Sequence, residues 1–244
     1  MNKKHFLIII SISILSVGLI FGSKYLFFVT EKNSEPVGDQ QDDLNQKYIK
    51  KKYVLSDRKD VFLELIDEKK YNYKDRTDDE ITNQGSYAIH EDKIVLNGGT
   101  TFVIKDGYIV TEDEDISNYY KVFFDEEVVD SETKSIEVAI QNWLKDVEDE
   151  HPELPRMESS EIEVSSCYYA IDNDIAEKNM TCVAKIKLNF DYTFENFEST
   201  SLDSLIVYAG EGLYYDDGYI FGGGIYSLNR TSGTYKVISR GSSF

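Results

Sequence analysis

The side chains that most often carry catalysis are few in this sequence and lie far apart. The three histidines are His5, His90 and His151. None of them belongs to a recognisable Ser-His-Asp set, and none sits at the spacing of a zinc-ligand motif. The sequence therefore predicts no catalytic residues, no metal site and no cofactor, and we expect a protein that is not an enzyme.

Two short motifs begin like ligand-binding loops but lack essential positions. The run Gly222–Gly224 has no following Lys-Ser/Thr pair, which a phosphate-binding loop requires. The run Asp172–Asp174 starts like a calcium loop, but Ala176 occupies the next ligand position. We expect a bulge or a close backbone approach at the glycines, and a solvated turn at the aspartates.

The two cysteines, Cys167 and Cys182, are expected on neighbouring antiparallel strands. The apolar phase of the first strand changes after Ser165 and Ser166. One extra residue there, a β-bulge opposite Val183, brings both cysteines to the same face. The resulting register pairs Cys167 with Cys182, Val164 with Ala184, and Ile162 with Ile186. A disulfide forms if the compartment is oxidising; the alternative is two buried free thiols.

Trp143 is the only tryptophan, and it is expected on a helix that packs against a sheet. Its main expected place is the core, but the same face can line an apolar ligand pocket with Phe190 and Tyr192 opposite. A proton-transfer enzyme would need an acid or a base inside that pocket. The inward face of the strand Val183–Phe194 supplies neither, which argues against an isomerase-like enzyme.

The helix that positions Trp143 is predicted from Ser131 to Val147. Apolar residues recur along it at helical spacing; they are Ile136, Ile140, Trp143, Leu144 and Val147. Ser131 is the expected N-cap, and Pro152 follows the end of the helix.

The remainder of the C-terminal part is predicted to be β-sheet. Val183–Phe194 alternates strictly between apolar and polar residues, as a half-buried strand does. Shorter strands are predicted at 204–209, 213–215, 219–228 and 234–240. With the closing sequence GTYKVISRGSSF, the plan from Tyr119 to Phe244 resembles the nuclear-transport-factor-2-like and cystatin-like cones of extracytoplasmic domains. The resemblance implies one amphipathic helix on a curved antiparallel sheet.

Residues 61–110 are predicted to form a meander of short strands. Turns at Asn97–Gly99 and at Asp106-Gly107 supply the positive φ that tight hairpins need. The string GSYAIHEDKIVLNGGTTFVIKDGYIV resembles the strand-and-turn pattern of lipocalin-like β-meanders in bacterial secreted proteins. This meander is too short for a closed eight-stranded barrel, so we expect a small open one. The predicted fold class is α+β, mainly antiparallel β.

The N-terminal stretch Phe6–Val29 is long and apolar enough for a transmembrane helix. Lys3 and Lys4 precede it, which predicts a single-pass signal anchor in the cell membrane with the C-terminal domain outside. A cleaved signal peptide is the alternative, but Ile20 and Phe21 stand where cleavage needs a small residue. The predicted divisions are 1–30 for the inside tail and anchor, 31–60 for a polar tether, 61–115 for the meander and 116–244 for the helix-plus-sheet domain.

The charge balance limits the classes of partner. The chain has 26 Lys and Arg against 45 Asp and Glu, a formal net charge of −19. Such a surface repels nucleic acid and anionic headgroups, so a charged partner is expected to be cationic: a metal ion, a basic peptide or a basic cell-wall polymer. The acids also keep the domain soluble, with or without a partner.

These observations lead us to expect a non-catalytic, membrane-anchored extracytoplasmic protein that binds or scaffolds a partner. One alternative is a carrier or enzyme that holds a small ligand in a cone-shaped pocket. Another is a single-span subunit of a secretion or conjugation complex, because the plan is similar to that of an inner-membrane component of type IV secretion systems. The extra meander fits that component poorly.

Overall fold

The computed structural model describes residues 46–76, 83–112, 119–153, 155–170, 179–190 and 214–241. Every strand pair recorded among them is antiparallel. No helix in these ranges is long and apolar enough to span a membrane. The predicted anchor, Phe6–Val29, lies outside them, as does the predicted strand at 204–209.

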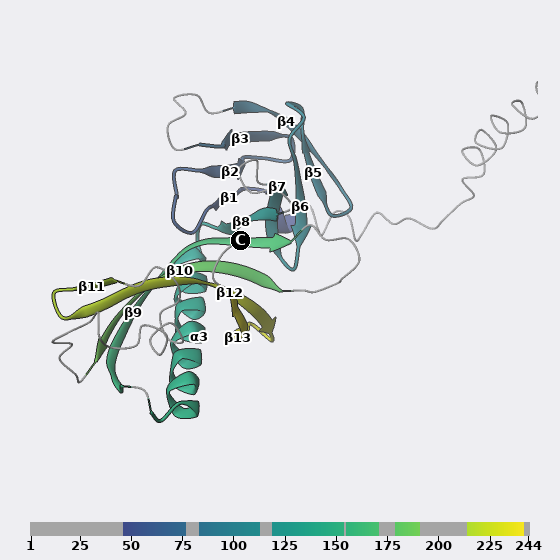
Figure 1. Ribbon diagram of the computed structural model, residues 1–244. Helices are drawn as coiled ribbons and strands as arrows, with labels where there is room; N and C mark the ends of the chain where they lie inside the picture. The colour runs from purple at the N-terminus through teal and green to yellow at the C-terminus, as the bar shows by residue number, and fades with distance from the viewer. Residues whose placement is uncertain are drawn as a thin grey trace, which may run out of the picture. The chain divides into compact units, whose positions relative to one another are not determined.

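The first strands form a closed barrel (Figure 1). Its eight members are β1 Lys51–Val54, β2 Phe62–Leu65, β3 Lys70–Lys74, β4 Asn83–His90, β5 Lys93–Leu96, β6 Thr101–Lys105, β7 Tyr108–Glu112 and β8 Tyr119–Asp125. Each strand pairs with the next one along the chain. The ring closes because β1 also pairs with β8, with Tyr53 opposite Asp125 and Val54 opposite Phe124.

The closed barrel shows that the predicted small open meander is wrong. The strands predicted within 61–110 supply only β2 to β7. The first closing strand, β1, lies in the segment predicted as a tether, where lysines flank the buried Tyr53 and Val54. The second, β8, was predicted to belong to the following domain. The fold is therefore mainly antiparallel β, with a closed barrel and one long helix, and not the predicted α+β plan.

The barrel interior is filled by the protein's own side chains. Aromatic and aliphatic residues alternate inward along the strands; they include Tyr53, Leu63, Leu65, Tyr71, Tyr73, Tyr87, Ile94, Leu96, Phe102, Ile109 and Phe123. The ring of Phe102 meets Tyr73 and Phe123 edge-on, at centroid distances of 5.2 and 5.8 Å. Such a packed interior stabilises the ring mainly by removing apolar surface from water.

Strands β7 and β8 are buried on both faces. Ile109 and Phe123 point into the barrel, whereas Val110, Val122 and Phe124 join a second core outside it. Strands covered on both sides read as continuous apolar runs instead of alternating ones. The barrel wall is thus also part of the second core.

The second core lies in an open sheet that continues from the barrel. Its long strands are β9 Met157–Ala170, β10 Met180–Phe190 and β12 Tyr219–Thr231, with the short strands β11 Tyr214–Asp216 and β13 Thr234–Gly241 beside β12. Because β8 pairs with β7 and β1 as well as with β9, the sheet crosses the predicted boundary near residue 115. The chain from Asn45 to Phe244 groups as one unit.

One face of the open sheet is covered by the helix α3, Val129–Glu150. Ile136, Ile140 and Leu144 are fully buried on it, as the spacing predicts. The predicted N-cap at Ser131 is wrong, because the buried Val129 draws an earlier turn into the helix. Val128 occupies the N-cap position without a side-chain cap, and the Ser131 hydroxyl donates to the Val128 carbonyl.

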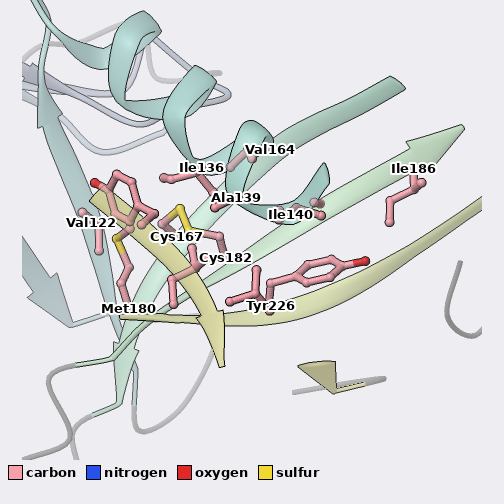
Figure 2. Close-up of a cluster of buried hydrophobic side chains, with 14 of the residues drawn as sticks. Val122, Ile136, Ala139, Ile140, Val164, Cys167, Met180, Cys182, Ile186 and Tyr226 are labelled. Atoms are coloured by element: carbon pink, nitrogen blue, oxygen red, sulfur yellow. A yellow bond between two sulfur atoms is a disulfide. The ribbon is translucent and has the colours of Figure 1, made fainter. Parts of the chain in front are cut away.

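A disulfide joins Cys167 on β9 to Cys182 on β10, beneath α3 (Figure 2). The two Cα atoms are 4.1 Å apart. The register shifts between Val183 and Ala184, and Ser165 is the extra residue on β9. Val164 lies opposite Ala184 and Ile162 opposite Ile186, which is the register expected from the change of apolar phase.

Candidate functional site

Two of the three residues predicted to line a ligand pocket, Trp143 and Phe190, pack in or against the second core. Trp143 is half-buried, with its ring 5.8 Å from that of Tyr226 and edge-on to it. Phe190 is buried at the end of β10, and Tyr192 lies outside the described residues. Neither Trp143 nor Phe190 lines the groove described below.

A groove of about 590 Å³ crosses the face of the open sheet that points away from α3. Ala184, Ile186 and Leu188 are buried on the helix side of β10. Lys185 and Lys187 therefore point to the opposite face, because successive strand residues alternate. The groove is lined by the side chains of Glu161, Glu163, Lys185, Lys187, Tyr214 and Phe221, with Ile162, Ile186 and Gly222 between them.

The strand register explains why this face is hollowed. One row of opposite residues contains Glu163, Lys185 and Gly223, and the next row on the same face contains Glu161, Lys187 and Phe221. The row between them is Ile162, Ile186 and Gly222. Its two isoleucine side chains turn toward α3, so backbone forms the floor of the groove.

Two stacked aromatic rings form one end of the groove. Tyr214 on β11 lies opposite Phe221 on β12, and their rings stack at 5.0 Å with planes 9° apart. Tyr219 lies on the same face, 6.4 Å from Phe221 between centroids. Tyr214 is 56% exposed, the highest value among the large hydrophobic side chains of the described residues. A flat aromatic surface is therefore open to solvent at this end.

The charges around the groove are mixed but mainly negative. The Lys187 ammonium donates to Glu161 at 3.1 Å and also lies 4.1 Å from the centre of the Tyr219 ring. The side chain of Glu158 accepts from Asn189 beside this pair, and Asp216 and Asp217 form the turn next to the stacked rings. Carboxylates thus outnumber ammonium groups here, and one aromatic ring already holds a cation.

The glycine run lies on β12 beside this groove. A Cβ added at Gly223 would come within 3.1 Å of the Ala184 carbonyl oxygen, and one at Gly224 would meet Arg240 at 3.1 Å. The backbone approach at Gly223 is the kind of close approach that the sequence predicts, whereas the neighbour at Gly224 is the side chain of Arg240. Sequence reasoning missed the groove because its residues come from β9, β10, β11 and β12. The one local indication is the Tyr and Phe alternation at 219 and 221 before the glycines.

A second polar cluster lies between the barrel, α3 and the β12–β13 hairpin. The Tyr235 hydroxyl donates to the Glu132 carboxylate. The Tyr108 hydroxyl has one proton to donate and lies within reach of both the Tyr235 hydroxyl and, at 3.4 Å, the same carboxylate. Arg230 donates to the same carboxylate at 2.7 Å and lies 5.3 and 5.4 Å from the centres of the Tyr108 and Tyr235 rings. The charged groups of this cluster satisfy one another, so its evident role is to join three elements.

Burial controls the ionisation of the tyrosines in this cluster. Desolvation, with the nearby Glu132 charge, raises the pKa of Tyr108 to about 12. Desolvation and the hydrogen bond to Glu132 also raise the pKa of Tyr235 far above its ordinary value. Both hydroxyls therefore stay protonated at neutral pH and act as hydrogen-bond donors.

The titratable groups elsewhere in the described ranges do not converge on a metal centre. Among these residues no group of three or more His, Cys, Asp or Glu side chains is arranged to hold a metal ion. His90 is exposed at the end of β4, and the imidazole of His151 contacts the Glu153 carboxylate at 3.1 Å. Comparisons of this chain with protein-family models, with curated proteins and with solved structures found no match.

Proposed function

We propose that this protein is a non-catalytic, membrane-anchored extracytoplasmic binding protein. Its groove on the open sheet binds an extended cationic segment of a partner protein. The observation that carries this proposal is the exposed stack of Tyr214 and Phe221 at the end of a groove bordered by glutamates. Large aromatic side chains exposed beside a concavity are typical of recognition surfaces.

The shape of the groove suits an extended chain. Its volume of about 590 Å³ is in the usual range for binding sites. Its floor is backbone, and its two walls are rows of side chains that cross three strands. A peptide can lie along the floor and place alternate side chains against the walls.

The chemistry of the groove suits Lys and Arg side chains. Tyr219 already holds the Lys187 ammonium against its ring, which illustrates the cation–π contact that the more exposed Tyr214 would offer to a partner. Glu161 and Glu163 supply carboxylates beside it. The net charge of −19 attracts a cationic partner at longer range and raises the association rate.

Two features support the proposed location. The stretch Phe6–Val29 has the length and composition of a membrane anchor. The disulfide between Cys167 and Cys182 belongs to a class of bond that persists in oxidising compartments and is rare in the cytosol.

The binding test uses the full-length chain in detergent and short oligo-lysine and oligo-arginine peptides, with titration calorimetry as the readout. Tyr214→Ala should weaken binding about two- to fivefold, the loss expected for one exposed cation–π contact. The matched control is Ile238→Ala, because Ile238 is 49% exposed on β13, outside the groove, and the change leaves the net charge unaltered. Ile238→Ala should bind like the parent, and added salt should weaken binding to all variants.

Two results would overturn the proposal. Equal affinities of Tyr214→Ala and Ile238→Ala would mean that the peptides bind through overall charge and not through the groove. Binding of a neutral oligosaccharide, sensitive to Tyr214→Ala and unaffected by salt, would assign the groove to a glycan instead of a cationic polypeptide.

A further inference from the structure

The open sheet keeps one long strand edge without a neighbouring strand among the described residues. Strand β9 pairs with β10 along most of its length, but on its other side it pairs with β8 only from Tyr168 to Ala170. The loop after β1 covers the next part of that side, where the Ser56 hydroxyl donates to the Ser165 carbonyl at 2.8 Å. Residues 158–164 have no strand partner there within the described ranges, and we call this stretch the β9 edge.

The β9 edge is regular, which sets it apart from the other outer strands. Its register with β10 runs without a shift from Ser159 to Val164. Strand β11 has only 3 residues, and β13 carries the extra residue Ile238 where its register with β12 shifts. Such a bulge bends a strand and interrupts its ladder. A regular edge instead presents backbone N–H and C=O groups at alternate residues, and it can pair with an added strand.

One face of the β9 edge is acidic. Glu161 and Glu163 point to the groove face, and Glu158 accepts from Asn189 on the same face at 2.8 Å. The Glu161 carboxylate accepts from Lys187. The Glu163 carboxylate is exposed, and no hydrogen bond or ion pair is recorded for it in the described part of the chain. Glu163 is therefore available to a cation from outside.

The opposite face of the β9 edge borders α3. Ile162 packs against the second core but remains only partly buried. Beside it, the Gln141 side chain donates to the Ser160 hydroxyl at 3.4 Å. The Glu148 carboxylate accepts from the Met157 backbone N–H at 2.7 Å, so the helix completes the strand just before the edge begins. An apolar side chain of an added strand would extend the core beside Ile162.

The charge of the β9 edge limits what can pair with it. If two copies of this chain paired antiparallel through this edge, their glutamates would face each other across the groove side. Like charges directly opposite each other destabilise a strand pair. Each copy also carries a net charge of −19, which adds repulsion. A strand with Lys or Arg at alternate positions instead brings a cation beside Glu161 and Glu163.

We propose that the β9 edge accepts an added strand from a partner protein, in which Lys or Arg alternates with apolar residues. The backbone of the partner strand hydrogen-bonds to residues 158–164. Its cations lie beside Glu161 and Glu163, and its apolar side chains lie beside Ile162. The groove floor crosses β9, β10 and β12, so strand addition at the edge is a different mode of binding. The inference goes beyond the function proposed for the groove and does not rest on it.

The test titrates the full-length chain in detergent with a peptide of alternating Lys and Val, by calorimetry and by amide hydrogen exchange. The companion ligand has the same composition, with its lysines and valines in two separate blocks. The alternating peptide should bind about tenfold or more tightly, because only it forms several backbone hydrogen bonds with each side chain on its proper face. Its binding should slow amide exchange in residues 158–164 and leave exchange in β13 unchanged.

Backbone methylation tests the hydrogen bonds directly. One version of the alternating peptide carries N-methyl groups on its lysines, and another carries them on its valines. In a strand these two sets of N–H groups point to opposite edges. One version should therefore lose about tenfold or more in affinity, whereas the other keeps the N–H groups that face β9.

Substitutions separate the edge from the groove. Glu163→Gln should weaken the alternating peptide about two- to fivefold, the loss expected for one exposed ion pair. Glu68→Gln is the matched control, because Glu68 is an equally exposed glutamate in the turn between β2 and β3. This control should bind like the parent. Tyr214→Ala should also bind like the parent, because Tyr214 stands at the end of the groove on β11.

Any of four results contradicts the inference. Equal affinities of the alternating and the blocked peptide would mean that charge alone drives binding. Equal effects of Glu163→Gln and Glu68→Gln would mean the same. Unchanged exchange in residues 158–164, with weaker binding to Tyr214→Ala, would place the peptide in the groove. Exchange in residues 158–164 that slows as the protein is concentrated without peptide would assign the edge to a second copy of this chain.

Discussion

The barrel and the open sheet consist of the same kind of antiparallel pairs, but they complete their structure in different ways. The pairing of β1 with β8 gives every barrel strand two neighbours, and the barrel fills its interior with its own side chains. The open sheet packs one face against α3, and a disulfide ties β9 to β10. Its other face carries the groove. The part that does not close on itself is the part that keeps one face uncovered by a helix.

This difference concerns how each region is stabilised. A closed ring removes the strand edges that invite unwanted pairing. A sheet with one uncovered face needs other constraints, and here α3 and the disulfide supply them. The two regions nevertheless share β8, which lines the barrel interior with Phe123 and contacts the second core with Phe124. We therefore expect them to unfold as one cooperative unit.

The largest expected effect comes from removing a side chain at this shared strand. Phe123→Ala should lower the free energy of unfolding by about 3–5 kcal/mol, because the ring is fully buried and leaves a cavity. Urea unfolding followed by circular dichroism, which reports on all strands, and by fluorescence of Trp143, which reports on the open sheet, should show one shared and shifted transition.

The control for this change is Val95→Ala, because Val95 is an exposed apolar residue of the barrel. It should alter stability by less than about 0.5 kcal/mol. If Phe123→Ala shifts the circular-dichroism transition and leaves the Trp143 transition in place, the two regions are separate folding units and the cooperative interpretation fails.

The next effect tests whether the open sheet depends on its cross-link. Replacing both Cys167 and Cys182 by alanine should lower the free energy of unfolding by about 3 kcal/mol, the chain-entropy value for a loop of this size. Amide hydrogen exchange should show the loss of protection concentrated in β9 and β10 rather than in β3. A reductant should reproduce the effect in the parent and have none in the double variant. Greater loss of protection in the barrel would contradict the comparison.

The smallest effect concerns the cluster that joins the two regions. Glu132→Gln should cost about 1–2 kcal/mol, because Arg230 and Tyr235 lose a charged acceptor. The folded-state pKa of Tyr108 is raised from 10.0 to about 12, so its contribution is complete below pH 10 and is lost as the pH rises through 12. Without the Glu132 charge the folded-state pKa of Tyr108 is raised less, so the alkaline loss should be smaller and should end at a lower pH.

Denaturant titrations across the alkaline range, read by circular dichroism, measure both effects. The control is Glu137→Gln, because Glu137 lies on the same helix and forms only a surface ion pair with Lys134. An alkaline profile of Glu132→Gln that matches the parent would show that the carboxylate does not set the ionisation of this cluster.

Much of the fold could be predicted where local chemistry determines it. The turn at Asp106 and Gly107 has the positive φ values expected of a tight hairpin. The alternation from Ala184 to Phe190 places the buried face of β10 correctly. The register of β9 on β10 follows from a change of apolar phase, because a one-residue slip would reverse the faces.

The closure of the barrel and the groove could not be predicted, because both depend on strands distant in sequence. β1 is short and flanked by lysines, and β8 is buried on both faces, so neither shows a clear two-residue period. The groove joins Glu161, Lys187 and Phe221 only after the sheet order places β10 between β9 and β12. Phe190 belongs to the second core and Trp143 packs against it, and the core is the main place that the helical spacing predicts for Trp143.

The pairing of β1 with β8 imposes an order on biosynthesis. Lys51 and Asp125, which meet at the closing seam, are 74 residues apart along the chain. A growing chain can form the local hairpins from β2 to β7 as they leave the ribosome, but β1 must wait for β8 to be made. Closing so long a loop carries a larger entropic cost than forming a hairpin. The seam should therefore be the slow step in maturation, and until it forms, the edge of β1 is exposed to chaperones and to other nascent chains.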